Sequence, residues 1–108
     1  MEAIPLDPQQ TLNNDLAANA QEAATLLKAM ANENRLMILC MLVDREMTVG
    51  ELNAVVPLSQ SALSQHLAAL RKADLVVTRR DAQTIYYQLS GNAARQVIGV
   101  LKELYCDK

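Results

Sequence analysis

Apolar residues recur at intervals of three and four positions along the first third of the chain, which predicts an amphipathic helix from about residue 11. The stripe consists of Leu12, Leu16, Ala20, Ala23, Leu27 and Met30. The residues before it include Pro5, Pro8 and two acidic side chains, so residues 1–10 are predicted to form a disordered N-terminal tail. Residues 11–108 are then expected to form one folded domain.

A second helix is predicted after Asn32, a residue type that is favoured at helix N-caps. Residues 36–43 are apolar without interruption. A helix that is apolar on nearly every side is expected to be buried on every side. We therefore expect this helix to lie at the centre of the domain.

Two shorter helices are predicted next. Thr48 and Glu51 have the spacing of a capping box, so a helix is expected to begin at about Val49. Its inward-facing residues are predicted to be Leu52, Val55 and Val56. Pro57 ends this helix, because the residue before a proline disfavours helical backbone. Ser59 is expected to cap the following helix, whose buried stripe is Leu63, Leu67 and Leu70.

The next segment changes to a strand-like pattern. Residues 75–78 and 84–89 are predicted strands, and the polar residues 79–83 between them are predicted to form a turn with an arginine-rich tip. Ser90 or Asn92 is expected to cap a last helix, whose apolar face is Val97, Ile98, Leu101, Leu104 and Tyr105. The predicted fold is mainly α with a small β-hairpin. A helix, a turn, a second helix and then a hairpin is the order of a winged helix-turn-helix.

Composition limits the function classes. The chain has 108 residues, 51% of them hydrophobic, which suits one domain. A helical domain of this size does not build a deep substrate cleft, so the chain is not expected to be an enzyme and no catalytic residues are assigned. No apolar run of about 18 residues exists and the N-terminus has no signal-peptide pattern, so a cytoplasmic protein without membrane contact is expected.

Basic residues are concentrated in the second half of the chain. Residues 1–58 carry three basic and eight acidic side chains, whereas residues 59–90 carry four basic and two acidic ones. The leading face of the predicted fourth helix contains only short hydrogen-bonding side chains, which suit base edges and phosphates. The predicted DNA-binding residues are Gln60, Ser61, Ser64 and Gln65 on that helix and Arg79, Arg80 and Gln83 on the hairpin. Ordinary surface scatter of charge is the alternative, and His66 is expected to be a packing residue.

At these residues the chain resembles the ArsR/SmtB family of winged-helix repressors. The resemblance covers residues 26–90 and is carried by Gly50-Glu51-Leu52, by residues 58–67 and by the segment from Arg79 to Leu89. Asp74 and Ala82 depart from it, because the family often has glycine at these turns. The resemblance implies a homodimer formed through the first and last helices, which would bind double-stranded DNA with an inverted repeat.

The resemblance also bears on the effector. No cysteine lies in Thr48–Leu52 and no histidine lies in the last helix, so no metal site and no cofactor are expected. Cys40 and Cys106, with their neighbours, resemble the persulfide- and redox-responsive branch that includes HlyU, BigR and SqrR. That branch implies that the dithiol form binds operator DNA and that a reactive sulfur species or another oxidant links the two sulfurs and weakens binding. From position alone, Cys40 is instead expected to be a small buried hydrophobe.

Several alternatives stay open. The chain could be an ArsR-type regulator without a thiol switch, which antagonises silencing and has structural cysteines, or a metal-responsive repressor. A thiol oxidoreductase is disfavoured because the sequence has no Cys-x-x-Cys motif. A winged helix that contacts only proteins is disfavoured because the leading face of the fourth helix has no acidic or large apolar side chain.

Overall fold

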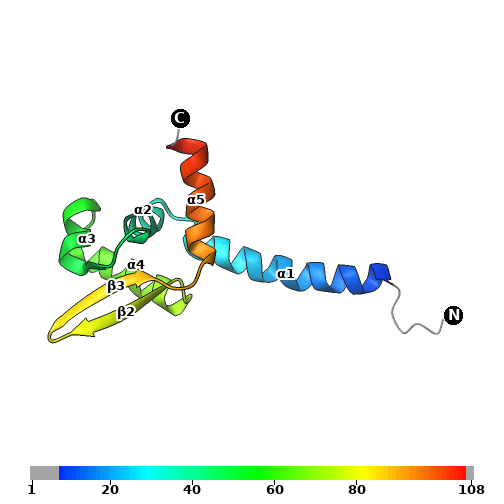
Figure 1. The fold of residues 1–108 in the computed structure, drawn as a ribbon, viewed down its shortest axis with the longest axis horizontal. Coiled ribbons are helices and arrows are strands. Elements are labelled where there is room, and N and C mark those ends of the chain that lie inside the picture. The colour runs from blue at the N-terminus through cyan, green and yellow to red at the C-terminus, as the bar shows by residue number, and fades with distance from the viewer. Residues whose placement is uncertain (1–7, 107–108) are drawn as a thin grey trace.

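The computed structural model describes residues 8–106, and the side chains from residue 14 onward. The described chain forms five helices and a three-stranded sheet. A small body is built from the segments after residue 30, and a long helix extends away from it (Figure 1). The sequence predicted this class of fold, and the structure confirms a helix-turn-helix followed by a wing.

Helix α1 (Pro8–Met30) forms the extension in Figure 1. Residues 14–25 are all exposed, and Met30 at the C-terminal end enters the core. The helix starts three residues before the predicted boundary, so the prediction of a tail was wrong for residues 8–10. A proline is tolerated in the first helical turn, where its missing N–H would have no partner anyway. The rest of the predicted tail, residues 1–7, lies outside the described residues.

Helix α2 (Glu33–Leu42) begins where predicted, with the Asn32 side chain accepting hydrogen bonds from the backbone N–H groups of Asn34 and Arg35. Ile38, Leu39 and Leu42 are buried. Cys40 is exposed, so the expectation that this helix is buried on every side was wrong. One face of α2 packs on the core, and the opposite face borders a hollow beside the last helix.

The helix-turn-helix consists of α3 (Val49–Val55) and α4 (Gln60–Lys72). The capping box is present, with Thr48 and Glu51 each bonding the other's backbone N–H. Leu52 and Val56 are buried as predicted, but Val55 is 51% exposed. The helix ends at Val55 and the backbone becomes extended at Val56, so only the second valine turns inward. Helix α4 is capped by Ser59 and buries its three predicted leucines.

The sheet contains β1 (Met47–Thr48), β2 (Val76–Asp81) and β3 (Thr84–Leu89) in the order β1-β3-β2, with antiparallel pairing. Arg79 and Arg80 lie in β2, so the prediction that they belong to a five-residue turn was wrong. The ladder continues to the pair Asp81–Thr84, which leaves only Ala82 and Gln83 as the turn. Ala82 has a φ of 59°, as a tight hairpin turn requires. Strand β1 was not predicted, because two residues show no alternation.

Helix α5 (Ala93–Tyr105) ends the described chain. Asn92 occupies the N-cap position, but its side chain makes no capping hydrogen bond. Ala94 and Ile98 are buried against the core, whereas Val100, Leu104 and Tyr105 remain exposed. Among the described residues, no helix is long and apolar enough to cross a membrane.

Candidate nucleic-acid interface and cysteine pair

The leading face of α4 is open to solvent. Its four predicted DNA-binding side chains, Gln60, Ser61, Ser64 and Gln65, are all exposed. The first turn carries no acidic residue, so neither charge nor packing obstructs an approaching phosphate. Ser59 accepts a hydrogen bond from the N–H of Ala62 at 3.1 Å, which confirms its role as a cap. The structure thus brings the four polar residues of α4 together on one accessible surface.

The buried side of α4 is joined to the rest of the core by Arg35. Arg35 Nε donates a hydrogen bond to His66 Nδ1 at 3.2 Å, and Arg35 Nη1 donates to the Ala29 carbonyl at 3.1 Å. His66 is half-buried, which confirms that it is a packing residue. One arginine therefore links the end of α1, the start of α2 and the middle of α4.

The wing carries the other predicted DNA-binding residues, and all of them are exposed. Arg80 Nε donates to the Ala82 carbonyl at 3.2 Å, and Gln83 lies in the turn. Arg79 makes two hydrogen bonds through its Nε and one through Nη2 to the carboxylate of Glu46. The Glu46 partner was missed from the sequence, because 33 positions separate it from Arg79.

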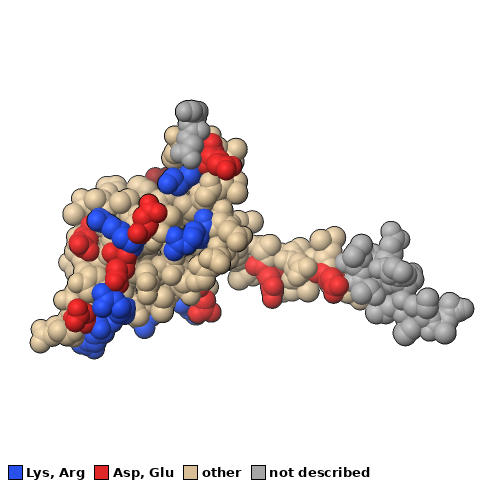
Figure 2. Space-filling view, in the orientation of Figure 1, with Lys and Arg blue, Asp and Glu red and all other residues tan. Residues whose placement is uncertain are grey.

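Charge is distributed unevenly over the surface. Figure 2 shows basic side chains gathered over β2 and β3, with acidic side chains beside them, while the described part of α1 shows acidic colour only. The hydrogen bonds from Arg79 hold the pKa of the Glu46 carboxyl below its usual range, and they raise the pKa of Arg79 in turn. Both groups therefore stay charged at neutral pH.

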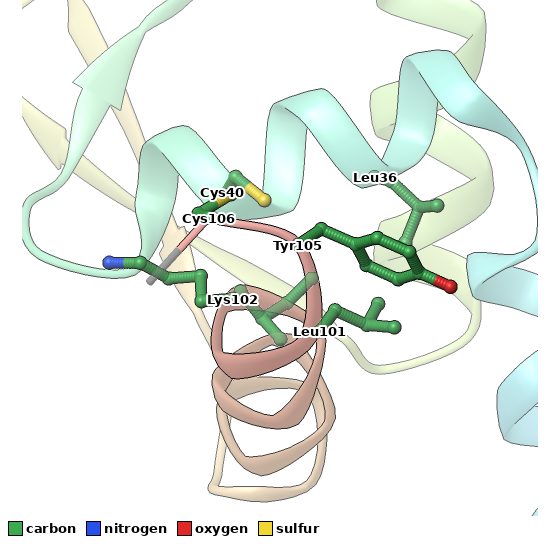
Figure 3. Close-up of a pocket in the computed structure, with 7 residues that line it drawn as sticks. Leu36, Cys40, Leu101, Lys102, Tyr105 and Cys106 are labelled. Carbon is green, nitrogen blue, oxygen red and sulfur yellow. The ribbon is translucent and has the colours of Figure 1, made fainter. Parts of the chain in front are cut away.

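The two cysteines line one apolar hollow. Cys40 comes from α2 and Cys106 from the residue after α5, and the hollow between these helices has a volume of about 200 Å³. Figure 3 shows the two cysteines next to each other, with Tyr105 and Leu101 farther along. The remaining lining residues are Leu36, Ile98 and Lys102. Both thiols are free and exposed, so the expectation of a buried Cys40 was wrong.

The hollow affects the acidity of Cys40. Burial against the apolar lining raises the pKa of the Cys40 thiol, proximity to Cys106 raises it further, and Lys102 lowers it. A thiol with a raised pKa is mostly protonated at neutral pH, and the thiolate is the reactive form. Lys102 was missed from the sequence, although its position four residues before Cys106 on a helix places both on one side.

The residues whose side chains are described, 14–106, contain no group of three or more histidine, cysteine, aspartate or glutamate side chains that could hold a metal ion.

Comparison with known proteins agrees with this geometry. Residues 32–78 match the family described as "Bacterial regulatory protein, arsR family". The chain is 55% identical to the transcriptional activator HlyU of Vibrio cholerae over 92 residues, which cover 85% of each protein. It is 53% identical to the nodulation protein NolR of Rhizobium meliloti over 98 residues, which cover 91% of this chain and 80% of NolR.

Solved structures give the same result. Reduced HlyU from Vibrio cholerae superposes with a TM-score of 0.81, covering 85% of this chain and 97% of HlyU at 55% identity. A homodimeric winged helix-turn-helix DNA-binding domain from Mycobacterium bovis superposes with a TM-score of 0.73 at 25% identity, covering 94% of this chain and 88% of that domain.

These relatives are transcriptional regulators with a DNA-binding fold, not enzymes, as the sequence predicted. The exposed polar face of α4 and the adjoining wing occupy the part of the fold that the family match covers in large part. The chain belongs to the ArsR family of bacterial transcriptional regulators.

Proposed function

We propose that two copies of this chain bind an inverted repeat in double-stranded DNA, and that linking Cys40 to Cys106 releases the DNA. The observation that supports the DNA-binding part is the exposed, acid-free leading face of α4. The observation that supports the switch is the shared apolar hollow of the two cysteines.

The DNA contacts follow from the chemistry of the exposed side chains. Gln60 and Gln65 can each bind an adenine through two hydrogen bonds, and the serines can bind bases or phosphates. The N-terminal end of α4 adds unpaired N–H groups and a positive dipole for the DNA backbone. Arg80 and Gln83 extend the same surface along the wing to a neighbouring stretch of backbone.

The proposed dimer would cover α1 and α5. These helices expose large apolar side chains that a monomer would leave in water. The side chains are Leu16, Leu27, Val100 and Leu104, with exposures between 51% and 66%. The Mycobacterium bovis relative is a homodimer. A two-fold dimer would place its two α4 helices in successive major grooves, about 34 Å apart.

The proposed switch is a thiol exchange. A persulfide transfers its outer sulfur to one cysteine thiolate and leaves as a thiol. The second cysteine thiolate then attacks the sulfur bonded to the first cysteine, a disulfide forms, and hydrosulfide leaves. With peroxide, two thiols give one disulfide and two waters. Either route ties α2 to the end of α5, and a longer sulfur chain would relax the distance limit of a disulfide.

The experiment follows covalent state and DNA binding in the same sample. The reduced chain is titrated with DNA selected from a random-sequence library, then treated with glutathione persulfide and analysed by intact mass. We expect a cross-link between Cys40 and Cys106 and a loss of DNA affinity of at least about tenfold, as for allosteric couplings in general.

Two variants provide the controls. Cys40→Ser and Cys106→Ser should bind the selected DNA like the parent chain and should keep binding after treatment. If the cross-link forms without a change in affinity, the cysteines have a structural role only. If the reduced chain selects no DNA at low salt, the DNA-binding proposal itself is wrong.

A further inference from the structure

The side chain of Arg79 is committed to a contact inside the protein. Its Nε lies 2.8 Å from Oε1 and 3.1 Å from Oε2 of Glu46, and its Nη2 lies 2.9 Å from Oε2. The guanidinium carbon also lies 4.5 Å from the centre of the Tyr86 ring. Such a forked pair, stacked on an aromatic face, fixes the orientation of the guanidinium plane and neutralises its charge.

The register of the sheet shows what this contact connects. Arg79 on β2 lies opposite Tyr86 on β3, and Tyr86 lies opposite Thr48 on β1. Glu46 stands two residues before Thr48, so side chains of one sheet face reach from β2 across β3 to the β1 edge. We call the three residues Glu46, Arg79 and Tyr86 the wing clamp.

The β1 edge leads directly into the helix-turn-helix. Thr48 is both the last residue of β1 and the N-cap of α3. The wing clamp therefore joins the wing to the start of the helix-turn-helix by a side-chain contact, in addition to the backbone ladder. A wing held in this way keeps a fixed direction relative to α4.

Arg80 is in a different position. Adjacent residues of a strand point to opposite faces, so Arg80 projects from the other side of β2. Its hydrogen bond goes to a backbone carbonyl of the turn, so its charge is not neutralised by that partner. Of the two arginines, Arg80 retains a charge that a phosphate could accept.

We propose that Arg79 is a positioning residue that orients the wing through Glu46 and makes no phosphate contact, and that Arg80 is the phosphate-binding arginine of the wing. The inference rests on the DNA-binding part of the proposed function and is independent of the thiol switch. It assigns to Arg79 a role different from the one predicted from the sequence.

The test uses the full chain and a DNA duplex of about 30 base pairs that the parent chain selects from a random library, long enough for two half-sites one helical turn apart. Affinity is measured over a range of salt concentrations. Each phosphate contact adds about 0.9 to the slope of log affinity against log salt, so losing one contact per subunit lowers the slope by about 2 in a dimer.

Three variants separate the roles. Arg80→Gln should lower the slope by about 2. Arg79→Gln should weaken binding by about threefold to tenfold with the slope unchanged. The double variant Glu46→Arg with Arg79→Glu reverses the pair at constant net charge, and it should bind within about threefold of the parent chain.

The inference is overturned if Arg79→Gln leaves the affinity unchanged or lowers the slope as Arg80→Gln does. It is equally overturned if the reversed pair does not restore binding, because a glutamate placed against a phosphate would repel it. Failure of the parent chain to select any duplex would instead count against the proposed function, so the two failures are distinguishable.

Discussion

Arg35 Nε donates a hydrogen bond to His66 Nδ1 at 3.2 Å, which joins the first turn of α2 to the middle of α4. The ring must be neutral at Nδ1 to accept this bond, so the proton of the neutral ring is on Nε2. Arg35 also holds the Ala29 carbonyl at the end of α1. The polar contact therefore sets the position of the DNA-facing helix against both helices before the helix-turn-helix.

We predict that His66→Phe lowers the free energy of unfolding by about 1–3 kcal/mol, because a partly buried Arg35 donor loses its acceptor. His66→Asn keeps an acceptor near the position of Nδ1 and should recover part of this loss. Urea denaturation of both variants measures the difference. Equal losses in the two variants would show that the ring packs but that its hydrogen bond contributes nothing.

The strained turn of the wing gives a second prediction. Ala82 and Asp74 are the non-glycine residues with positive φ in the described chain, at 59° and 61°. Ala82→Gly should stabilise the protein by about 1 kcal/mol, since a left-handed alanine carries a steric cost that glycine does not. Asp74→Gly should gain less, because aspartate tolerates this conformation better. Thermal unfolding of the two variants compares them directly, and a destabilised Ala82→Gly would contradict the explanation.

The Cys40 environment predicts a pH-dependent reactivity. Burial raises the pKa of Cys40, so its alkylation by iodoacetamide in a Cys106→Ser background should reach half its maximal rate at a higher pH than an ordinary thiol does. Lys102 lowers the pKa of Cys40, so Lys102→Gln should move that midpoint further upward. Lys28→Gln, at the end of α1, is the matched control and should leave the midpoint in place. A midpoint at or below the ordinary thiol value would disprove the prediction.

The wing clamp predicts a component of stability that disappears in acid. Hydrogen bonds from Arg79 lower the pKa of Glu46 in the folded state. The carboxylate therefore contributes stability that is complete above its unfolded-state pKa and is lost as the pH falls through the lower folded-state pKa. The difference in melting temperature between the parent chain and Glu46→Gln should be largest near neutral pH and should vanish in acid. Glu22→Gln, on the exposed arm of α1, should not change the pH profile, and a difference for Glu46→Gln that persists in acid would contradict this account.

The elements predicted best from the sequence are those with local chemical signals. Asn32, Thr48 and Ser59 marked three helix starts correctly, because a capping side chain acts on backbone groups two or three residues away. The α4 stripe of leucines was equally clear. The predicted polar face of α4 followed from the same periodicity.

The features that were missed depend on contacts between distant residues. Nothing near Glu46 announces Arg79, and β1 exists only because β3 pairs with it. The wing register was misjudged because Ala82 takes a conformation that usually calls for glycine. Cys40 was expected to be buried because its neighbours are apolar, but the face of α2 that it occupies borders the hollow beside α5.

The long exposed arm of α1 has a consequence for how much of this protein a cell can keep. Residues 14–25 have almost no packing within the chain, and most helix stability in proteins comes from packing. An arm that gains its packing only from a second copy melts at a temperature that rises with protein concentration. Dilute protein would then expose frayed arms to proteases, so that scarcity itself would hasten the removal of the regulator.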